Sequence, residues 1–64
     1  MKLYEFEVEL FSENIGITCY EHVHVRVNDF NEAVDKFYED YGTAYEKSFF
    51  NYDVKNVRLI ANNF

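Results

Sequence analysis

The chain has 64 residues, enough for one domain over residues 1–64 and too few for a second. Twelve acidic side chains against six basic ones give a net charge of −6, which disfavours direct binding to nucleic acid or to anionic membranes because both require a basic surface. The same charge favours a protein partner with a basic surface, because opposite charges speed association.

Within the stretch from Leu3 to Phe11, apolar and acidic residues alternate strictly from Tyr4 to Leu10. This period of two predicts a strand with one buried face. Its exposed face carries Glu5, Glu7 and Glu9, spaced about 6.8 Å apart. Two interpretations are open, because such a row can simply keep a small protein soluble or can imitate the phosphates of a DNA strand.

A turn is predicted over residues 12–16, where Asn14 and Gly16 tolerate a positive φ, and a second strand is predicted from about Ile17 to Val27. For both apolar rows to share one side of the hairpin, the numbers of paired residues must add up to an odd sum. The glutamates of the first strand then lie opposite the even-numbered residues of the second strand. That arrangement places Glu5 and Glu7 opposite Tyr20, His22 or His24.

Glu21 interrupts the apolar row of this second strand. Burying a carboxylate without a partner is costly. We therefore expect that Glu21 lies near a sheet edge, is turned outward by a bulge, or is used by a binding partner.

A helix is predicted after Asn28, with Asp29 as its N-cap and Glu32 completing a capping box. Gly42 fits the residue that follows the last turn. The apolar stripe consists of Phe30, Ala33, Val34, Phe37 and Tyr41. The opposite face is a second acidic surface, relieved only by Lys36, and consists of Glu32, Asp35, Glu39 and Asp40.

Residues 43–46 predict the start of another short helix through Phe49 or Phe50. The segment from Tyr52 to Ala61 is strand-like, but its alternation slips between Val54 and Val57. We favour one strand with a bulge at Lys55–Asn56, with a hairpin as the alternative. The predicted fold is α+β, an antiparallel three-stranded sheet with one helix packed on a face, in the order ββαβ.

We predict no catalytic residue, metal or cofactor, and hence no enzyme. His22 and His24 with a nearby glutamate could bind zinc, but cross-strand His–Glu pairing is the expected arrangement. Cys19 is expected to be a buried small hydrophobe. Because it is the only cysteine, no internal disulfide can form, which suits a reducing cytoplasm.

Seven Phe and six Tyr are more aromatic side chains than a core of this size needs, so we expect some at the interface of a homodimer. Phe37 and Tyr41 lie on the apolar stripe of the helix, where they form the core or line a pocket between protomers. Tyr38 lies off the stripe and is expected to be exposed.

Two short motifs resemble the small phage-encoded uracil-DNA glycosylase inhibitors of the compact ββαβ type. Tyr20-Glu21 resembles the end of the family's Tyr-Tyr-Glu, with Cys19 in place of the first Tyr, and residues 37–42 resemble its Phe-x-x-x-Tyr-Gly. The order of elements agrees over roughly residues 4 to 60. The resemblance implies an acidic homodimer in the host cell cytoplasm that occupies the DNA-binding groove of the repair enzyme.

By this resemblance Glu21 stands in for a phosphate, and Phe37 and Tyr41 line a pocket for an apolar side chain of the enzyme. We therefore expect an inhibitor of a basic DNA-binding enzyme, with two groups of partner-binding residues. The phosphate mimics are Glu5, Glu7, Glu9, Glu21, Glu32, Asp35 and Glu39, and the hydrophobic pocket is Phe37, Tyr41 and Tyr38. The alternatives are an inhibitor of a bacterial defence system, such as CRISPR or restriction, and a non-enzymatic assembly module.

Overall fold

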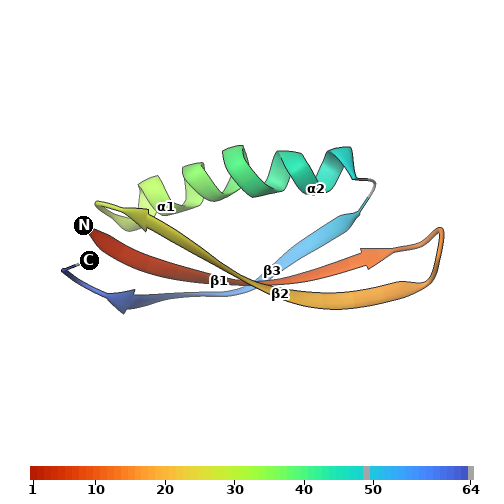
Figure 1. Cartoon of the computed structure of the whole chain (residues 1–64), viewed down its shortest axis with the longest axis horizontal. Helices are drawn as coiled ribbons and strands as arrows, with labels where there is room; N and C mark the ends of the chain where they lie inside the picture. The colour runs from red at the N-terminus through yellow and green to blue at the C-terminus, as the bar shows by residue number, and fades with distance from the viewer. Residues whose placement is uncertain (49, 64) are drawn as a thin grey trace.

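A computed structural model of the chain describes residues 1–48 and 50–63. Three strands, β1 (Lys2–Ser12), β2 (Ile17–Val27) and β3 (Asn51–Ala61), form one antiparallel sheet in the order β2-β1-β3. A continuous helical segment over residues 30–47 packs on one face of this sheet (Figure 1). The order of elements is ββαβ, so the predicted α+β fold is confirmed.

The hairpin of β1 and β2 has one of the registers that the alternation allows. Glu5 lies opposite His24 and Glu7 opposite His22, and all eleven residues of β2 pair with β1. The turn is closed by the N–H of Gly16, which donates to the carbonyl oxygen of Ser12 at 2.9 Å, and Gly16 has a φ of +65°. Glycine suits this position because other L-residues rarely adopt a positive φ.

β3 is a single bulged strand, which confirms the predicted bulge and excludes the hairpin. The pairing with β1 shifts between Glu7, opposite Asn56, and Val8, opposite Val54, so that Lys55 is the extra residue. A second shift near the start of β1 leaves Ile60 as another extra residue. Each extra residue reverses the alternation, and the slip in the sequence pattern marks the first of them.

The helical segment begins with α1 (Phe30–Phe37), and Asp29 is its N-cap as predicted. The Oδ1 atom of Asp29 accepts the N–H of Glu32 at 2.9 Å. The Glu32 carboxylate in turn accepts the N–H of Asn28 at 3.0 Å. Two N–H groups at the start of the helix region therefore have partners, and Glu32 lies at the positive end of the helix dipole.

The prediction that the first helix ends before Gly42 is wrong. A π-helical stretch, η1 (Tyr38–Gly42), and then α2 (Thr43–Lys47) continue the same helical segment. Gly42 has helical dihedral angles, and a Cβ atom on it would lie 2.8 Å from the hydroxyl of Tyr52. The glycine is therefore required for space between helix and sheet. α2 stops before Phe50, and the other predicted end, Phe49, lies outside the described residues.

The core lies between the helix and the sheet and centres on Phe37. Its ring stacks on Phe6 with centroids 4.5 Å apart and planes 3° apart, and both side chains are buried. The other buried apolar residues are Tyr4, Val8, Leu10, Val23, Val25, Val27 and Ala33. None of the helices that the structure describes is long and apolar enough to cross a membrane.

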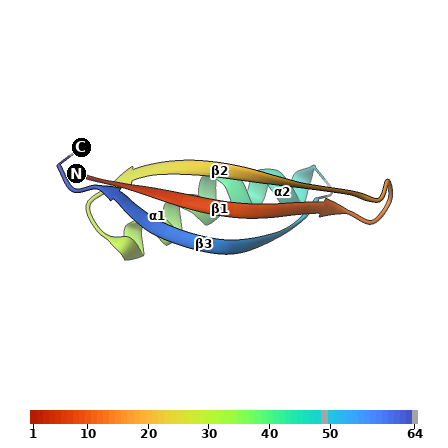
Figure 2. The same cartoon turned by 90° about the horizontal axis from the view of Figure 1, so that it is seen from below.

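The helix crosses the twisted sheet obliquely, as Figures 1 and 2 show. α1 packs over the end of β2, whereas α2 packs near the beginning of β3. The beginning of β2 therefore has no helix above it, and Ile17 and Cys19 are exposed. The prediction that Cys19 is buried is wrong, because the twist of the sheet carries the beginning of β2 away from the helix (Figure 1).

Candidate functional site: two acidic surfaces

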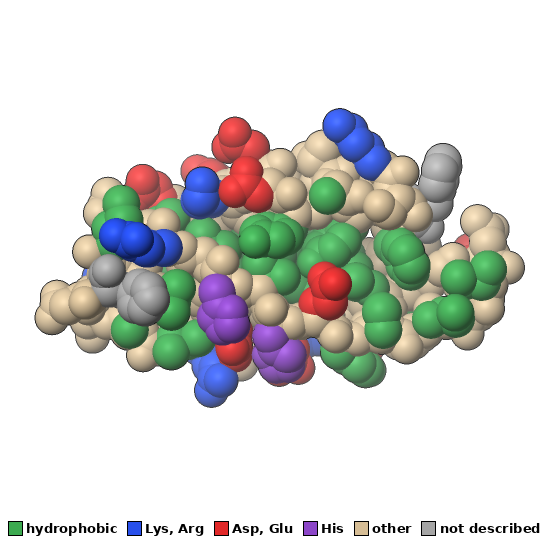
Figure 3. Space-filling view, in the orientation of Figure 1, with side chains coloured by type: hydrophobic (Ala, Val, Ile, Leu, Met, Phe, Trp, Pro, Cys, Tyr) green, Lys and Arg blue, Asp and Glu red, His purple; other side chains and the backbone are tan. Residues whose placement is uncertain are grey.

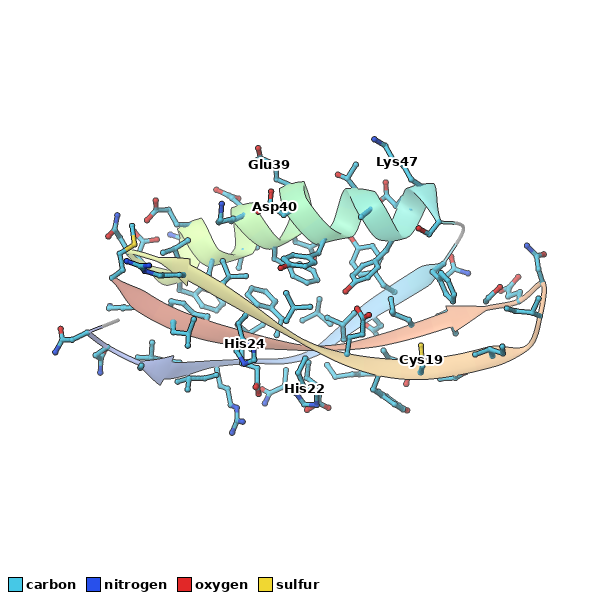
Figure 4. The ribbon with its side chains drawn as sticks, viewed as in Figure 1. Cys19, His22, His24, Glu39, Asp40 and Lys47 are labelled. Atoms are coloured by element: carbon cyan, nitrogen blue, oxygen red, sulfur yellow. The ribbon has the colours of Figure 1, made fainter. Side chains whose placement is uncertain are left out.

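The outer face of the helix carries most of the negative charge. Between Asp29 and Lys47 the chain has six acidic side chains and two lysines. Figure 4 shows Glu39 and Lys47 projecting away from the sheet, and all eight charged side chains belong to exposed residues. This side of the molecule therefore has a net charge of −4 out of −6 for the chain.

Three of these helix acids, Asp35, Glu39 and Glu46, have neither an ion pair nor a side-chain hydrogen bond among the described residues. The others are partly occupied within the chain. Asp29 and Glu32 cap the helix, and Asp40 pairs with Lys36 at 3.4 Å. We call Asp35, Glu39 and Glu46 the helix acidic surface, because their carboxylates remain available to a partner.

The row on β1 differs, because its first member is neutralised within the chain. The Oε1 atom of Glu5 accepts from Nε of Arg58 at 3.0 Å and lies 2.9 Å from its other guanidinium nitrogen. His24 contacts Oε2 at 3.1 Å, and His22 lies 3.5 Å from Oε1. Only 12% of the Glu5 side chain is exposed, so a partner's cation could reach Glu5 only by displacing Arg58.

These contacts also shift the ionisation of Glu5. Desolvation at the centre of the sheet raises its pKa, but hydrogen bonds from Arg58, His22 and His24 and the guanidinium charge outweigh this effect. The net result is a pKa below the ordinary value for glutamate. Glu5 is thus held as a carboxylate in a cross-strand cluster, and the expected His–Glu pairing is confirmed.

Glu7 and Glu9 lie on the open face of the sheet, and their charges are less neutralised within the chain than that of Glu5. Glu7 has no ion pair among the described residues, and Glu9 accepts a hydrogen bond from the Tyr20 hydroxyl at 3.0 Å. That hydrogen bond and the Glu9 charge raise the pKa of Tyr20. The surrounding side chains include Lys55 and Arg58, so this face is much closer to neutral than the helix.

Glu21 lies on an outer strand of the sheet, which is the first of the three explanations predicted for it. Its Oε2 atom accepts the hydroxyl of Tyr45 from α2 at 2.6 Å. Burial and this hydrogen bond to a carboxylate raise the pKa of Tyr45. Glu21 is exposed, and its hydrogen bond with Tyr45 links α2 to β2. The sequence did not indicate this contact.

The three aromatic residues of the predicted pocket differ in access. Phe37 has no exposed surface and touches Phe6 in the core. Tyr38 is 50% exposed, as predicted, and Tyr41 is 36% exposed, with its ring 5.9 Å from that of Phe37. Tyr38 and Tyr41 are therefore the only two of the three that a partner could touch without opening the core.

His22 and His24 point away from the helix on the open face of the sheet (Figure 4). Within residues 1–48 and 50–63, no group of three or more His, Cys, Asp and Glu side chains is arranged to hold a metal ion. The residues that sequence reasoning missed are Arg58, Tyr45 and Glu46. Arg58 could have been paired with Glu5 only by knowing the position of the bulge in β3.

Comparison with protein-family models, with curated proteins and with solved structures finds no match.

Proposed function

We propose that the protein inhibits a DNA-binding enzyme by occupying its nucleic-acid groove, with carboxylates in the place of phosphates. By the sequence resemblance, the proposed target is uracil-DNA glycosylase. In this proposal the protein is phage-encoded, is not itself an enzyme, and acts as a homodimer in the cytoplasm of the host cell.

The observation that supports the proposal most is the uneven distribution of charge. The helix acidic surface holds three carboxylates without internal partners on a segment with four acids in excess. Unpaired carboxylates on a rigid element attract a basic groove from a distance and orient the approach. A face that served only solubility would not need this excess of acids to lie on one element.

The shape of the molecule is also compatible with a groove that binds DNA. The Cα atoms extend over 41 × 17 × 13 Å. A length of 41 Å corresponds to about 12 base pairs at 3.4 Å each. The helix acidic surface and Glu7 with Glu9 lie on opposite faces of this rod, as the phosphates of two strands lie on opposite sides of a duplex.

In the refined proposal the helix acidic surface is the main phosphate mimic, and Glu7 and Glu9 are the secondary one. Glu5 has a structural role in the sheet, because its carboxylate already forms an ion pair with Arg58. Glu21 and Glu32 are exposed but accept hydrogen bonds from their own chain. Tyr38 and Tyr41 would provide apolar contact beside the acids.

An inhibition assay tests the proposal directly. Uracil excision from a labelled oligonucleotide is measured with purified bacterial uracil-DNA glycosylase and increasing amounts of the protein. We expect inhibition that is competitive with DNA and weakens as salt rises, because surface charges are screened over about 10 Å at 0.1 M salt.

Absence of inhibition together with absence of binding would remove this enzyme as the target. A parallel assay with a CRISPR nuclease and a restriction enzyme distinguishes the alternative targets. If the protein displaces DNA from none of these enzymes, the mimic is rejected and the assembly module is favoured.

A further inference from the structure

The outer edge of β2 is a regular strand edge without a partner among the residues that the structure describes. All eleven residues of Ile17–Val27 pair with β1 with no shift in register. In an antiparallel strand, half of the N–H and C=O groups then point away from the sheet in an even row. Such a row is a template for another strand, and proteins usually protect it.

The other edge of the same sheet is protected. β3 has two bulges, which interrupt its pairing near Lys55 and Ile60, and it carries Lys55 and Arg58. Bulges and positive charges are devices that prevent an edge from pairing with another strand. β2 also carries charged residues, Glu21 and Arg26, but it has no bulge, so it is the more regular of the two edges and the better suited to pairing.

The surface next to the β2 edge is also incomplete. Ile17 is 51% exposed and Cys19 is exposed, because the helix passes away from them. A groove of about 430 Å³ lies between Tyr41 of the helix and residues 21–24 of β2. Apolar side chains form a band between the helix and β2 in Figure 3. A strand added to β2 would lie along this groove.

We propose that this edge pairs with β2 of a second copy of the chain, in antiparallel orientation about a twofold axis at His22. The two three-stranded sheets would then form one continuous sheet. The buried faces of the two sheets lie on the same side of the combined sheet only if odd-numbered residues lie opposite odd-numbered ones. An axis at His22 is the one that pairs the whole strand, with Ile17 opposite the partner's Val27.

This register explains why a second copy suits the edge better than an unrelated strand. In this register the beginning of β2, which no helix covers, lies beside the end of the partner's β2, over which the partner's α1 packs. Ile17 and Cys19 therefore come next to the partner's helix. On the open face, Tyr20 lies opposite the partner's His24. No carboxylate lies opposite another carboxylate, because Glu21 faces the partner's Val23.

The test uses the full chain. It bears on the homodimer named in the proposed function but does not depend on the proposed enzyme target. Sedimentation equilibrium measures the mass over a range of concentrations up to about 1 mM. We expect the mass of two chains, and amide hydrogen exchange in β2 that slows as the dimer forms. One chain's mass at every concentration would overturn the proposal.

Oxidative crosslinking then tests which residues of the two β2 strands lie opposite each other. In a Cys19→Ser background, His22→Cys places two thiols opposite each other across the axis, and we expect a disulfide-linked dimer. Tyr20→Cys places them about 13 Å apart at 3.3 Å per residue, and we expect at least tenfold slower crosslinking. Asn56→Cys, exposed on β3, is the matched control. Faster crosslinking of Tyr20→Cys or Asn56→Cys than of His22→Cys would contradict the proposed pairing.

Discussion

Gly42 illustrates how one residue sets the distance between the helix and the sheet. A Cβ atom there would meet the Tyr52 hydroxyl at 2.8 Å, and real Cβ atoms essentially never come so close to another atom. The next contacts, Cδ1 of Tyr38 at 3.2 Å and Cζ of Tyr52 at 3.4 Å, are less severe. The obstacle to a side chain at Gly42 is therefore mainly one oxygen atom.

Gly42→Ala should lower the free energy of unfolding by about 1–3 kcal/mol, the usual cost of overpacking a core. In a Tyr52→Phe background the same substitution should cost much less, and can become stabilising because alanine favours a helix by about 1 kcal/mol over glycine. Urea denaturation of the four proteins measures this coupling. Equal effects in the two backgrounds would mean that the hydroxyl is not the obstacle.

Glu5 makes a pH-dependent contribution to stability. Its pKa is lower in the folded chain than its ordinary value, so the carboxylate stabilises the fold above that ordinary value. The contribution is lost as the pH falls through the lowered folded value. We expect Glu5→Gln to lower the melting temperature at pH 7, and the difference from wild type to shrink as the pH falls below the ordinary glutamate value and Glu5 itself becomes protonated.

Glu39→Gln is the control for this measurement, because Glu39 is exposed and has no ion pair among the described residues. It should change the melting temperature little at pH 7. If Glu5→Gln and Glu39→Gln behave alike, the Glu5–Arg58 cluster does not contribute to stability.

At the scale of elements, the start of the helix depends on Asp29. Its carboxylate satisfies the N–H of Glu32, and replacing such an N-cap by alanine costs about 0.5–2 kcal/mol. Asp29→Ala should therefore lower the denaturation midpoint, whereas Asp29→Ser should retain most of the stability because serine also caps helices. Equal losses in the two variants would contradict the role of the cap.

The strands were predictable from the sequence because alternation of apolar and polar residues is a local signal. The β1 pattern, the register with β2 and the bulge near Lys55 all follow from it. The end of the helix was not predictable in this way. Gly42 resembles a helix terminator locally, but the helix continues through it, and the approach of Tyr52, ten positions away in the chain, accounts for a glycine there.

The candidate site shows the same division between local and distant information. The spacing of Asp35 and Glu39 predicts an exposed face of the helix, and both residues are exposed. Whether the charge of Glu5 is available to a partner depends on Arg58, which is distant in sequence and lies opposite Glu5 on β3. Sequence periodicity identifies which residues share a face, but not which of their charges are already paired.

At the scale of the whole molecule, the acidic helix lies on one side of the sheet and a nearly neutral face lies on the other. Asp35→Asn/Glu39→Gln should weaken binding to a DNA-binding enzyme by at least about tenfold, because two unpaired charges leave the interface. Glu13→Gln/Asp29→Asn changes the net charge by the same amount outside both acidic surfaces, and it is the matched control because asparagine also caps helices. A similar loss in both variants would mean that net charge, rather than the helix acidic surface, determines binding.

The most direct test of the central claim is displacement of DNA from bacterial uracil-DNA glycosylase, followed by the fluorescence anisotropy of a labelled duplex. The protein should release the duplex in a concentration-dependent manner, and Asp35→Asn/Glu39→Gln should require at least about ten times more protein than wild type or the control. The claim would be contradicted if the protein bound the enzyme and left the duplex in place, or if the substituted helix displaced DNA as well as wild type does.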